Sequence, residues 1–291
     1  MFKQASKQAA KIKMSLHGAA GSGKTFSALT LAFSLGERIA IVDTENSSAS
    51  LYADKFPPYD LLDLKPPYSP ERFIEAIKGA EKEGYDVIII DSFSSEWDGQ
   101  GGCLDIHTKL GGNSYTAWSK VTPRHDALIE EILRANIHII CCMRAKQSYA
   151  MEQESGQKAK VNKLGLAPVQ RDNVEYNFTL CFALNQQHMI EVMKDRTGLF
   201  VGKNFIIDAH TGETILSWLN AEPKKVIECM DALQFGAIVD LYAAAQANDK
   251  FKTLEDAGIK KLKTIENVIS AKQKLNTEQA NHAIEFLRTL Q

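Results

Sequence analysis

Residues 18–25 of the chain read GAAGSGKT and fit the pattern GxxxxGKT at every fixed position. An apolar run at residues 12–16 precedes this motif, and a helix-like segment at residues 26–35 follows it. Glycines in such a loop let successive backbone N–H groups turn inward around a triphosphate. The flanking pattern disfavours the alternative, a glycine-rich turn that carries Lys-Thr by chance. The motif therefore predicts a phosphate-binding loop between a strand and a helix.

The loop also defines a set of expected ligand contacts. Lys24 would place a point charge on the β and γ oxygens of the nucleotide, and the Thr25 hydroxyl would ligate Mg²⁺. ATP and Mg²⁺ are therefore the expected cofactors. The predicted nucleotide-binding residues are Gly18, Gly21, Ser22, Gly23, Lys24 and Thr25.

The composition is that of an ordinary globular protein. With 291 residues, 44% hydrophobic residues and a net charge of −2, the chain can bury a sizeable core, and we expect one large domain with an appendage. Residues 1–11 form a basic arm, because the first acidic residue is Glu37, and any nucleic-acid surface must be local. The cysteines show no zinc-binding spacing, which predicts reduced thiols and a cytoplasmic location. No apolar run approaches membrane-spanning length, so no membrane contact is expected.

Alternation of apolar runs and helix-like stretches indicates the fold class. Three apolar, β-branched runs lie at residues 39–43, 87–91 and 137–143. Helix-like stretches at residues 70–83 and 126–135 separate them, which predicts an α/β fold with a mostly parallel central sheet and helices on both faces. Two later strand-like runs, residues 175–184 and 189–194, are joined by a short turn and predict antiparallel strands at the edge of the sheet.

The last quarter of the chain is rich in helix-like segments. Glu222 and Pro223 mark a junction, and no candidate catalytic cluster follows them. We therefore expect a core at residues 12–219 and a small helical domain at residues 220–291. Thr277 predicts the start of a last helix with its apolar residues on one face, which serves either packing or a partner.

Two acidic residues follow predicted strands. Asp91 closes the buried run at residues 87–91 and is the expected second ligand of the magnesium ion. Ser92 comes next, so the base that polarises attacking water must come from elsewhere. Glu45 is the candidate, because it follows the strand that ends at Asp43, and the carboxyl ends of parallel strands converge on the ligand. The alternative is that Asp43 and Glu45 only cap the next turn.

This arrangement resembles the RecA superfamily over residues 12–215. In that superfamily a glutamate beyond the second strand serves as base, and serine typically follows the aspartate strand. Residues 194–198, KDRTG, are similar to the KxRxG element of the DnaB and RadA branches. The resemblance implies that Lys194 and Arg196 reach the γ-phosphate held by a neighbouring subunit, where they stabilise transferring charge. The alternative is an exposed hairpin that carries two charges.

One position departs from the RecA pattern. Where residues 137–143 end, RecA-like proteins usually place a glutamine that senses the γ-phosphate, whereas this chain has Arg144. The guanidinium is expected either to contact the γ-phosphate or to pair with Asp91 or Glu45 as a structural ion pair.

Residues 145–173 are expected to form a long polar loop that is functional or disordered. In RecA-like proteins the matching loop lines the path of single-stranded DNA, and cations with an aromatic residue suit a groove that follows the phosphate backbone. As a charge pattern alone, the segment also fits a solvated loop. The predicted DNA-binding residues are Lys146, Tyr149, Lys158, Lys160, Lys163 and Arg171. A second, glycine-rich segment at residues 98–114 is expected to be a mobile loop that orders on binding.

Three runs look like the bacteriophage-type RecA-like ATPases, a group that includes single-strand annealing and recombination proteins: DSFSSEW at residues 91–97, SYTAW at residues 114–118, and KDRTG. The resemblance implies a Mg²⁺-dependent ATPase that assembles head to tail with copies of itself on single-stranded DNA. The alternative is a nucleotide-dependent interaction switch, such as a helicase loader or a signalling ATPase. In either case the helical domain is available for another replication or recombination protein.

Overall fold

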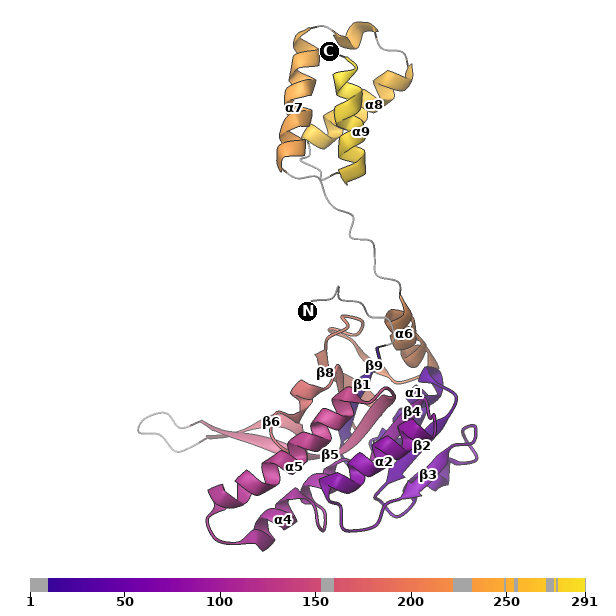
Figure 1. The fold of residues 1–291 in the computed structure, drawn as a ribbon, viewed down its shortest axis with the longest axis vertical. Coiled ribbons are helices and arrows are strands. Elements are labelled where there is room, and N and C mark those ends of the chain that lie inside the picture. Colours follow the sequence, from indigo (N-terminus) through magenta and orange to yellow (C-terminus); the bar gives the residue numbers. More distant parts are fainter. Residues whose placement is uncertain are drawn as a thin grey trace. The chain divides into compact units, whose positions relative to one another are not determined.

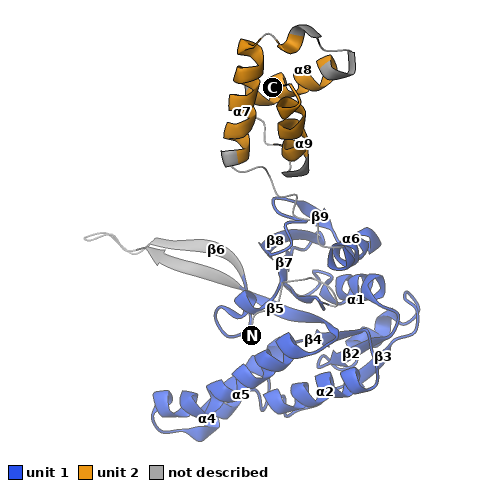
Figure 2. Cartoon of the chain, turned by 45° about the horizontal axis from the view of Figure 1, so that its top comes forward, with its two compact units in different colours: residues 1–222 blue, residues 223–291 orange. Residues whose placement is uncertain are grey.

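The computed structural model describes residues 10–152, 160–221, 232–248, 250–253, 256–270, 275 and 277–290; for residues 147–166 it describes no side chains. The chain forms two compact units, Met1–Glu222 and Pro223–Gln291, which are shown in different colours in Figure 2 and are described separately below.

The first unit is built around a nine-stranded sheet with the order β3-β2-β4-β5-β1-β7-β8-β9, and β6 pairs with β5 off this path (Figure 1). All pairings from β3 to β7 along this order are parallel, whereas β8 and β9 are antiparallel to their neighbours. The predicted α/β fold with a mostly parallel sheet and antiparallel edge strands is thus confirmed. The strands are β1 (Lys13–Gly18), β2 (Ile39–Asp43), β3 (Asp60–Asp63), β4 (Val87–Asp91), β5 (His138–Glu152), β6 (Lys160–Pro168), β7 (Leu180–Leu184), β8 (Met189–Asp195) and β9 (Asn204–Ile206).

Helices cover both faces of this sheet. On one face α1 (Lys24–Leu35) packs beside α6 (Ala209–Asn220), and on the other α2 (Pro70–Lys82) packs beside α5 (Ser114–Arg134), as Figure 1 shows for α2 and α5. The shorter helical elements are η1 (Ser48–Tyr52), α3 (Ser94–Asp98), α4 (Cys103–Leu110) and η2 (Val174–Asn177).

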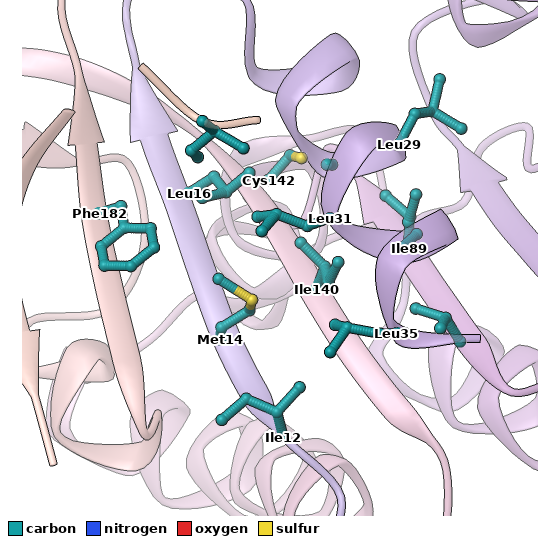
Figure 3. Close-up of a cluster of buried hydrophobic side chains, with 14 of the residues drawn as sticks. Ile12, Met14, Leu16, Leu29, Leu31, Leu35, Ile89, Ile140, Cys142 and Phe182 are labelled. Atoms are coloured by element: carbon teal, nitrogen blue, oxygen red, sulfur yellow. The ribbon is translucent and has the colours of Figure 1, made fainter. Parts of the chain in front are cut away.

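Two apolar layers result from the alternation of side chains along the central strands. In β4, Val87 and Ile89 join the cluster under α1, whereas Ile88 and Ile90 join the cluster under α2 and α5. Figure 3 shows the first cluster, in which Met14 and Leu16 of β1 lie with Leu31 and Leu35 of α1. Each fully buried aliphatic side chain contributes about 1.5–3 kcal/mol by leaving water. Because both faces are covered, the central strands read as continuous apolar runs.

The starts of two of these helices carry local sequence signals. In α2, Pro70 takes the first helical position after Ser69, which is the N-cap residue but makes no side-chain capping hydrogen bond. Asp208 caps α6 through a capping box with Thr211, whose backbone N–H it accepts at 2.9 Å.

Two segments that the sequence predicts to be loops contain regular structure. Residues 145–173 were expected to lack it, but β5 continues to Glu152 and pairs antiparallel with β6. The two strands of such a ribbon pair their backbone groups with each other, which a polar sequence also permits. Residues 98–114 include α4, with the left-handed Gly101, Gly111 and Gly112 placed around its ends. The glycines there delimit a helix, so the expectation that this segment is a loop is wrong, while its ordering on binding stays a prediction.

The second unit is helical. Its elements are α7 (Ala232–Ala247), η3 (Lys250–Thr253), α8 (Asp256–Ser270) and α9 (Thr277–Arg288). The apolar face predicted for the last helix packs inward, because Ala280 and Leu287 are fully buried in a cluster with Ile238 of α7 and Ile265 of α8. Of the described helices in either unit, none is long and apolar enough to cross a membrane.

Two buried histidines make the first unit sensitive to acid. His17 on β1 and His138 on β5 are 3% and 4% exposed, and burial is the largest cause that lowers the pKa of each from 6.5 to about 4. Between these pH values the unfolded chain binds more protons than the folded chain. The destabilisation by these two histidines is therefore absent well above pH 6.5 and grows as the pH drops toward 4. The expected loss at pH 4 is on the order of 3 kcal/mol for each histidine.

A single substitution tests this expectation. His138 Nδ1 accepts the Ile12 backbone N–H at 3.1 Å, and a protonated imidazole has no lone pair for that bond. In His138→Asn the amide oxygen can accept the same N–H without titrating. Urea unfolding followed by circular dichroism should show a flatter loss of stability between pH 6.5 and 4 in this variant. His210→Asn is the control, since the His210 side chain is 81% exposed and the variant should follow the unchanged protein. An unaltered pH slope in His138→Asn would contradict the assignment.

Candidate functional site

The phosphate loop lies between the end of β1 and the start of α1, as the motif predicts. Gly21 (φ 78°) and Gly23 (φ 87°) adopt left-handed conformations that favour glycine. Gly18 is required for a different reason: a Cβ there would lie 2.5 Å from Ser22 Oγ and 2.6 Å from the Leu184 carbonyl oxygen. Ser22 Oγ is buried and has no hydrogen-bond partner among the described residues, which is an orphaned polar atom within the loop. The backbone therefore has the shape of an anion cradle.

Lys24, Thr25 and Asp91 come together at the mouth of this cradle. Lys24 Nζ donates to the carbonyl oxygens of Gly18 at 3.1 Å and Ala19 at 3.0 Å, so the ammonium lies over the loop. Thr25 Oγ1 donates to Asp91 Oδ2 at 2.6 Å. Burial raises the pKa of Asp91 to about 6, against the opposing effects of the Thr25 hydrogen bond and the Lys24 charge. A hydroxyl next to a carboxylate is a suitable donor set for Mg²⁺, so these residues fit the expected ion.

A cavity of about 750 Å³ opens over the loop, within the usual range for small-molecule sites. Besides the loop residues, the cavity is lined by Phe26, Ser27, Glu45, Tyr52, Arg144, Ala145, His188, Ile206 and Ile207. Phe26 packs edge-on against Tyr52, with ring centroids 6.0 Å apart, so the wall next to the phosphate loop is aromatic. A wall of this kind suits a nucleobase. Phe26, Tyr52 and His188 belong to no sequence motif, so their place in the site could not be predicted from the sequence.

The structure separates the roles of the two acidic residues that follow β2. Asp43 is fully buried, and its carboxylate accepts the backbone N–H groups of Glu45 at 2.6 Å and Ala49 at 2.8 Å. Asp43 therefore caps the turn after β2, which is the alternative role given above for both acidic residues. Glu45 instead is exposed and lines the cavity. Its position is compatible with a base that acts on water near the phosphates.

Arg144 lines the cavity but has a different ion-pair partner from those expected. Its guanidinium pairs with Asp98 at the end of α3. The expected pairing with Asp91 or Glu45 is therefore wrong, because the short α3 helix that follows β4 brings Asp98 to the end of the parallel part of β5. Contact between Arg144 and a γ-phosphate stays a prediction.

Lys194 and Arg196 lie at the opposite end of the sheet from the phosphate loop of the same chain. Lys194 Nζ donates to the carbonyl oxygens of Glu175 at 2.9 Å and Tyr176 at 2.6 Å, and Arg196 Nη2 donates to that of Tyr176 at 3.0 Å. Asp195, between the two cations, pairs with Leu180 of β7, which is in register with Met14 of β1. That level is four residues before Gly18, or about 13 Å back along the strand at roughly 3.3 Å per residue.

The predicted DNA-binding residues are only partly within the described side chains. Lys146 is exposed on β5, directly after the cavity-lining Ala145. Arg171 pairs with Asp126 of α5 at 2.9 Å, so its charge is partly neutralised. Lys158 lies outside the described residues, and Tyr149, Lys160 and Lys163 belong to β5 and β6 without described side chains.

A buried polar cluster lies beside the site and was missed by the sequence analysis. The carboxylate of Glu96, which is fully buried, accepts hydrogen bonds from Cys103 Sγ at 3.0 Å, His125 Nδ1 at 3.1 Å and Gln170 Nε2 at 3.1 Å. Burial is the main cause that raises the pKa of the Cys103 thiol, so the sulfur stays a donor. Three donors satisfy the carboxylate, and the cluster ties α3, α4, α5 and the segment after β6 together.

Comparison with known proteins identifies the class of the first unit. The family described as "AAA domain" matches residues 10–216, which include the phosphate loop, Asp91 and the Lys194 strand. No curated protein sequence matches the chain.

Proposed function

Because the chain belongs to the AAA domain family, whose P-loop fold binds nucleotides, we propose that it hydrolyses ATP with Mg²⁺ and uses this reaction in single-stranded DNA annealing or recombination. It does so as a head-to-tail assembly of identical subunits. The observation that carries the proposal is the placement of Lys194 and Arg196 at the end of the sheet remote from their own phosphate loop.

The chemistry follows from the residues around the cavity. Backbone N–H groups of the loop and Lys24 bind the phosphates. Thr25 and Asp91 would hold Mg²⁺, which neutralises charge on the phosphate oxygens when bound. Glu45 orients a water molecule and accepts its proton. These groups are all within one chain, and the cations that they offer to the charge developing on the transferring phosphoryl group are Lys24 and the magnesium ion, with Arg144 of the cavity lining as a further candidate.

Two further cations, Lys194 and Arg196, are supplied by the next subunit. Lys194 pairs with Cys181, which is in register with Ser15, three residues or about 10 Å before Gly18 along the strand. Because this exceeds the roughly 6 Å length of a lysine side chain, Lys194 cannot reach its own nucleotide. Moving Lys194 to its own nucleotide would require β8 to separate from β7, with loss of the antiparallel backbone pairing between them. A head-to-tail contact instead brings the Lys194 end of one subunit to the cavity of its neighbour, and such heterologous contacts build rings or filaments. Hydrolysis then depends on assembly.

Single-stranded DNA is proposed to follow the β5–β6 ribbon. Arg144 and Ala145 line the nucleotide cavity, and Lys146 is the next residue of the same strand. A lysine that contacts a DNA phosphate would therefore directly follow residues that contact the nucleotide. The rival function, a nucleotide-dependent interaction switch, is favoured by two observations. Arg171 is paired with Asp126, and the helical second unit is a separate compact body available to a partner.

Salt dependence separates the two functions. We expect ATPase activity per subunit to rise with protein concentration and with single-stranded DNA. The logarithm of the DNA affinity should fall with the logarithm of salt concentration by about 0.7 for each phosphate contact. Lys146→Ala should reduce that slope by about one contact, whereas Lys78→Ala, a lysine on α2 with a side chain 62% exposed, should not. Absence of salt-sensitive DNA binding would favour the switch.

A further inference from the structure

The turn between β7 and β8 lies against the phosphate loop. Gln186 Nε2 donates to the carbonyl oxygen of Ala20 at 3.0 Å, and His188 Nδ1 lies 3.0 Å from the carbonyl oxygen of Ser22. A carbonyl only accepts, so His188 Nδ1 must carry the hydrogen. The turn therefore donates two hydrogen bonds to alternate peptide groups of the loop.

These two carbonyls determine where two N–H groups point. In a trans peptide the carbonyl of one residue and the N–H of the next point in opposite directions from the same plane. Fixing the Ala20 carbonyl therefore fixes the N–H of Gly21, and fixing the Ser22 carbonyl fixes the N–H of Gly23. Both glycines are in the left-handed conformation and have few intrinsic restraints of their own. The turn supplies the restraint that they lack.

The turn is itself well held. Asn185 Oδ1 accepts the backbone N–H groups of Gln187 at 2.9 Å and Met189 at 3.0 Å, and Leu184, which precedes it, is in register with Gly18. His188 has a positive φ of 63°, which directs its side chain toward the loop, where a Cβ on Gly23 would lie 2.9 Å from Nδ1.

We propose that Gln186 and His188 are positioning residues that set the affinity for the triphosphate by holding the Gly21 and Gly23 amides in their binding orientation. This inference rests on nucleotide binding by the loop, as in the proposed function, but on neither DNA binding nor assembly. It extends the site to an element that is remote in sequence.

Nucleotide titration tests the proposal. A fluorescent ATP analogue should bind about 3- to 10-fold more weakly to Gln186→Ala and to His188→Ala, since a net hydrogen bond is worth that factor. The double variant should lose on the order of 10- to 50-fold. The KM for ATP should rise in parallel while kcat and the melting temperature change little. Gln187→Ala is the control from the same turn, because only the backbone of Gln187 is bonded to Asn185.

Rescue separates positioning from a merely structural role. His188→Asn retains a nitrogen donor near the place of Nδ1 and tolerates positive φ, so it should bind the analogue nearly as well as the unchanged protein. Unchanged affinity in the double variant would overturn the proposal, as would an asparagine variant as weak as the alanine variant. If the double variant does not fold, Gln186→Ala decides, because that side chain is exposed. Failure of the unchanged protein to bind the analogue would instead overturn the proposed function as well.

Discussion

Lys194→Ala and Arg196→Ala should each lose ATPase activity by a factor of about 10³ or more, since cations supplied to a phosphoryl transfer from a neighbouring subunit have effects of this size. Both variants should still bind ATP, because neither side chain touches the phosphate loop of its own chain. The measurement is steady-state ATPase activity of each variant alone, at a protein concentration that supports assembly.

Mixing each variant with Glu45→Ala gives the stronger test. At a 1:1 ratio, a site is complete only when its loop comes from the finger variant and its cations from the Glu45 variant. Random head-to-tail contacts meet this condition about a quarter of the time, so about a quarter of normal activity should return. Cations acting within their own chain would give no recovery at any ratio, and that outcome would remove the claim of shared sites.

A matched lysine controls for lost packing. Lys203 Nζ donates to the carbonyl oxygen of Leu199 at 2.8 Å, which is the same kind of contact that Lys194 makes with Tyr176. Lys203→Ala should keep most of its ATPase activity. A comparable loss in Lys203→Ala would show that carbonyl anchoring, and not charge delivered to a neighbour, explains the Lys194 result.

Glu45→Gln is the second large effect that we expect. The amide keeps the size of the side chain but cannot accept a proton, so kcat should fall by about 10²- to 10⁴-fold while the affinity for ATP changes less than about threefold. Single-turnover hydrolysis and nucleotide titration measure the two quantities separately. Retention of more than about a tenth of kcat would place the base elsewhere.

Asp43→Asn provides the contrast for that experiment. Its buried carboxylate holds the Glu45 and Ala49 N–H groups, and an amide cannot accept from both as well. This variant should lower the melting temperature and weaken nucleotide binding and turnover together. Glu213→Gln on α6, with a side chain 67% exposed, should leave both activity and stability unchanged.

The parts of the fold that sequence could predict are those with local signals. The motif at residues 18–25 predicts a strand before it, a loop within it and a helix after it. The continuous apolar residues of β2 and β4 predict buried parallel strands. Asp91 followed from the same reasoning, since it ends such a run, and Thr25 indeed lies within hydrogen-bond distance of it.

The remaining features depend on contacts between distant residues. The Gln186 and His188 bonds to the loop each join residues 166 positions apart through one side chain and one carbonyl, and no local pattern encodes such a pair. The β5–β6 ribbon was not predicted because the polar composition of this segment indicates a loop, whereas the ribbon depends on backbone pairing between its two strands. The ion-pair partner predicted for Arg144 was wrong, because the length of α3, and not the composition of the segment, determines which acidic residue lies beside Arg144.

The Asp195 carboxylate accepts the backbone N–H groups of Thr197 at 2.6 Å, Gly198 at 3.0 Å and Phe200 at 2.8 Å, so the corner after β8 is tightly braced. Lys194 and Arg196 flank this turn, and both side chains donate to the carbonyl oxygen of Tyr176. Under the proposed function the two positive groups therefore move together as one rigid element. The angle at which two protomers dock would then determine whether these cations reach the neighbour's γ-phosphate, and small rotations between protomers along an assembly would raise or lower the rate of ATP hydrolysis.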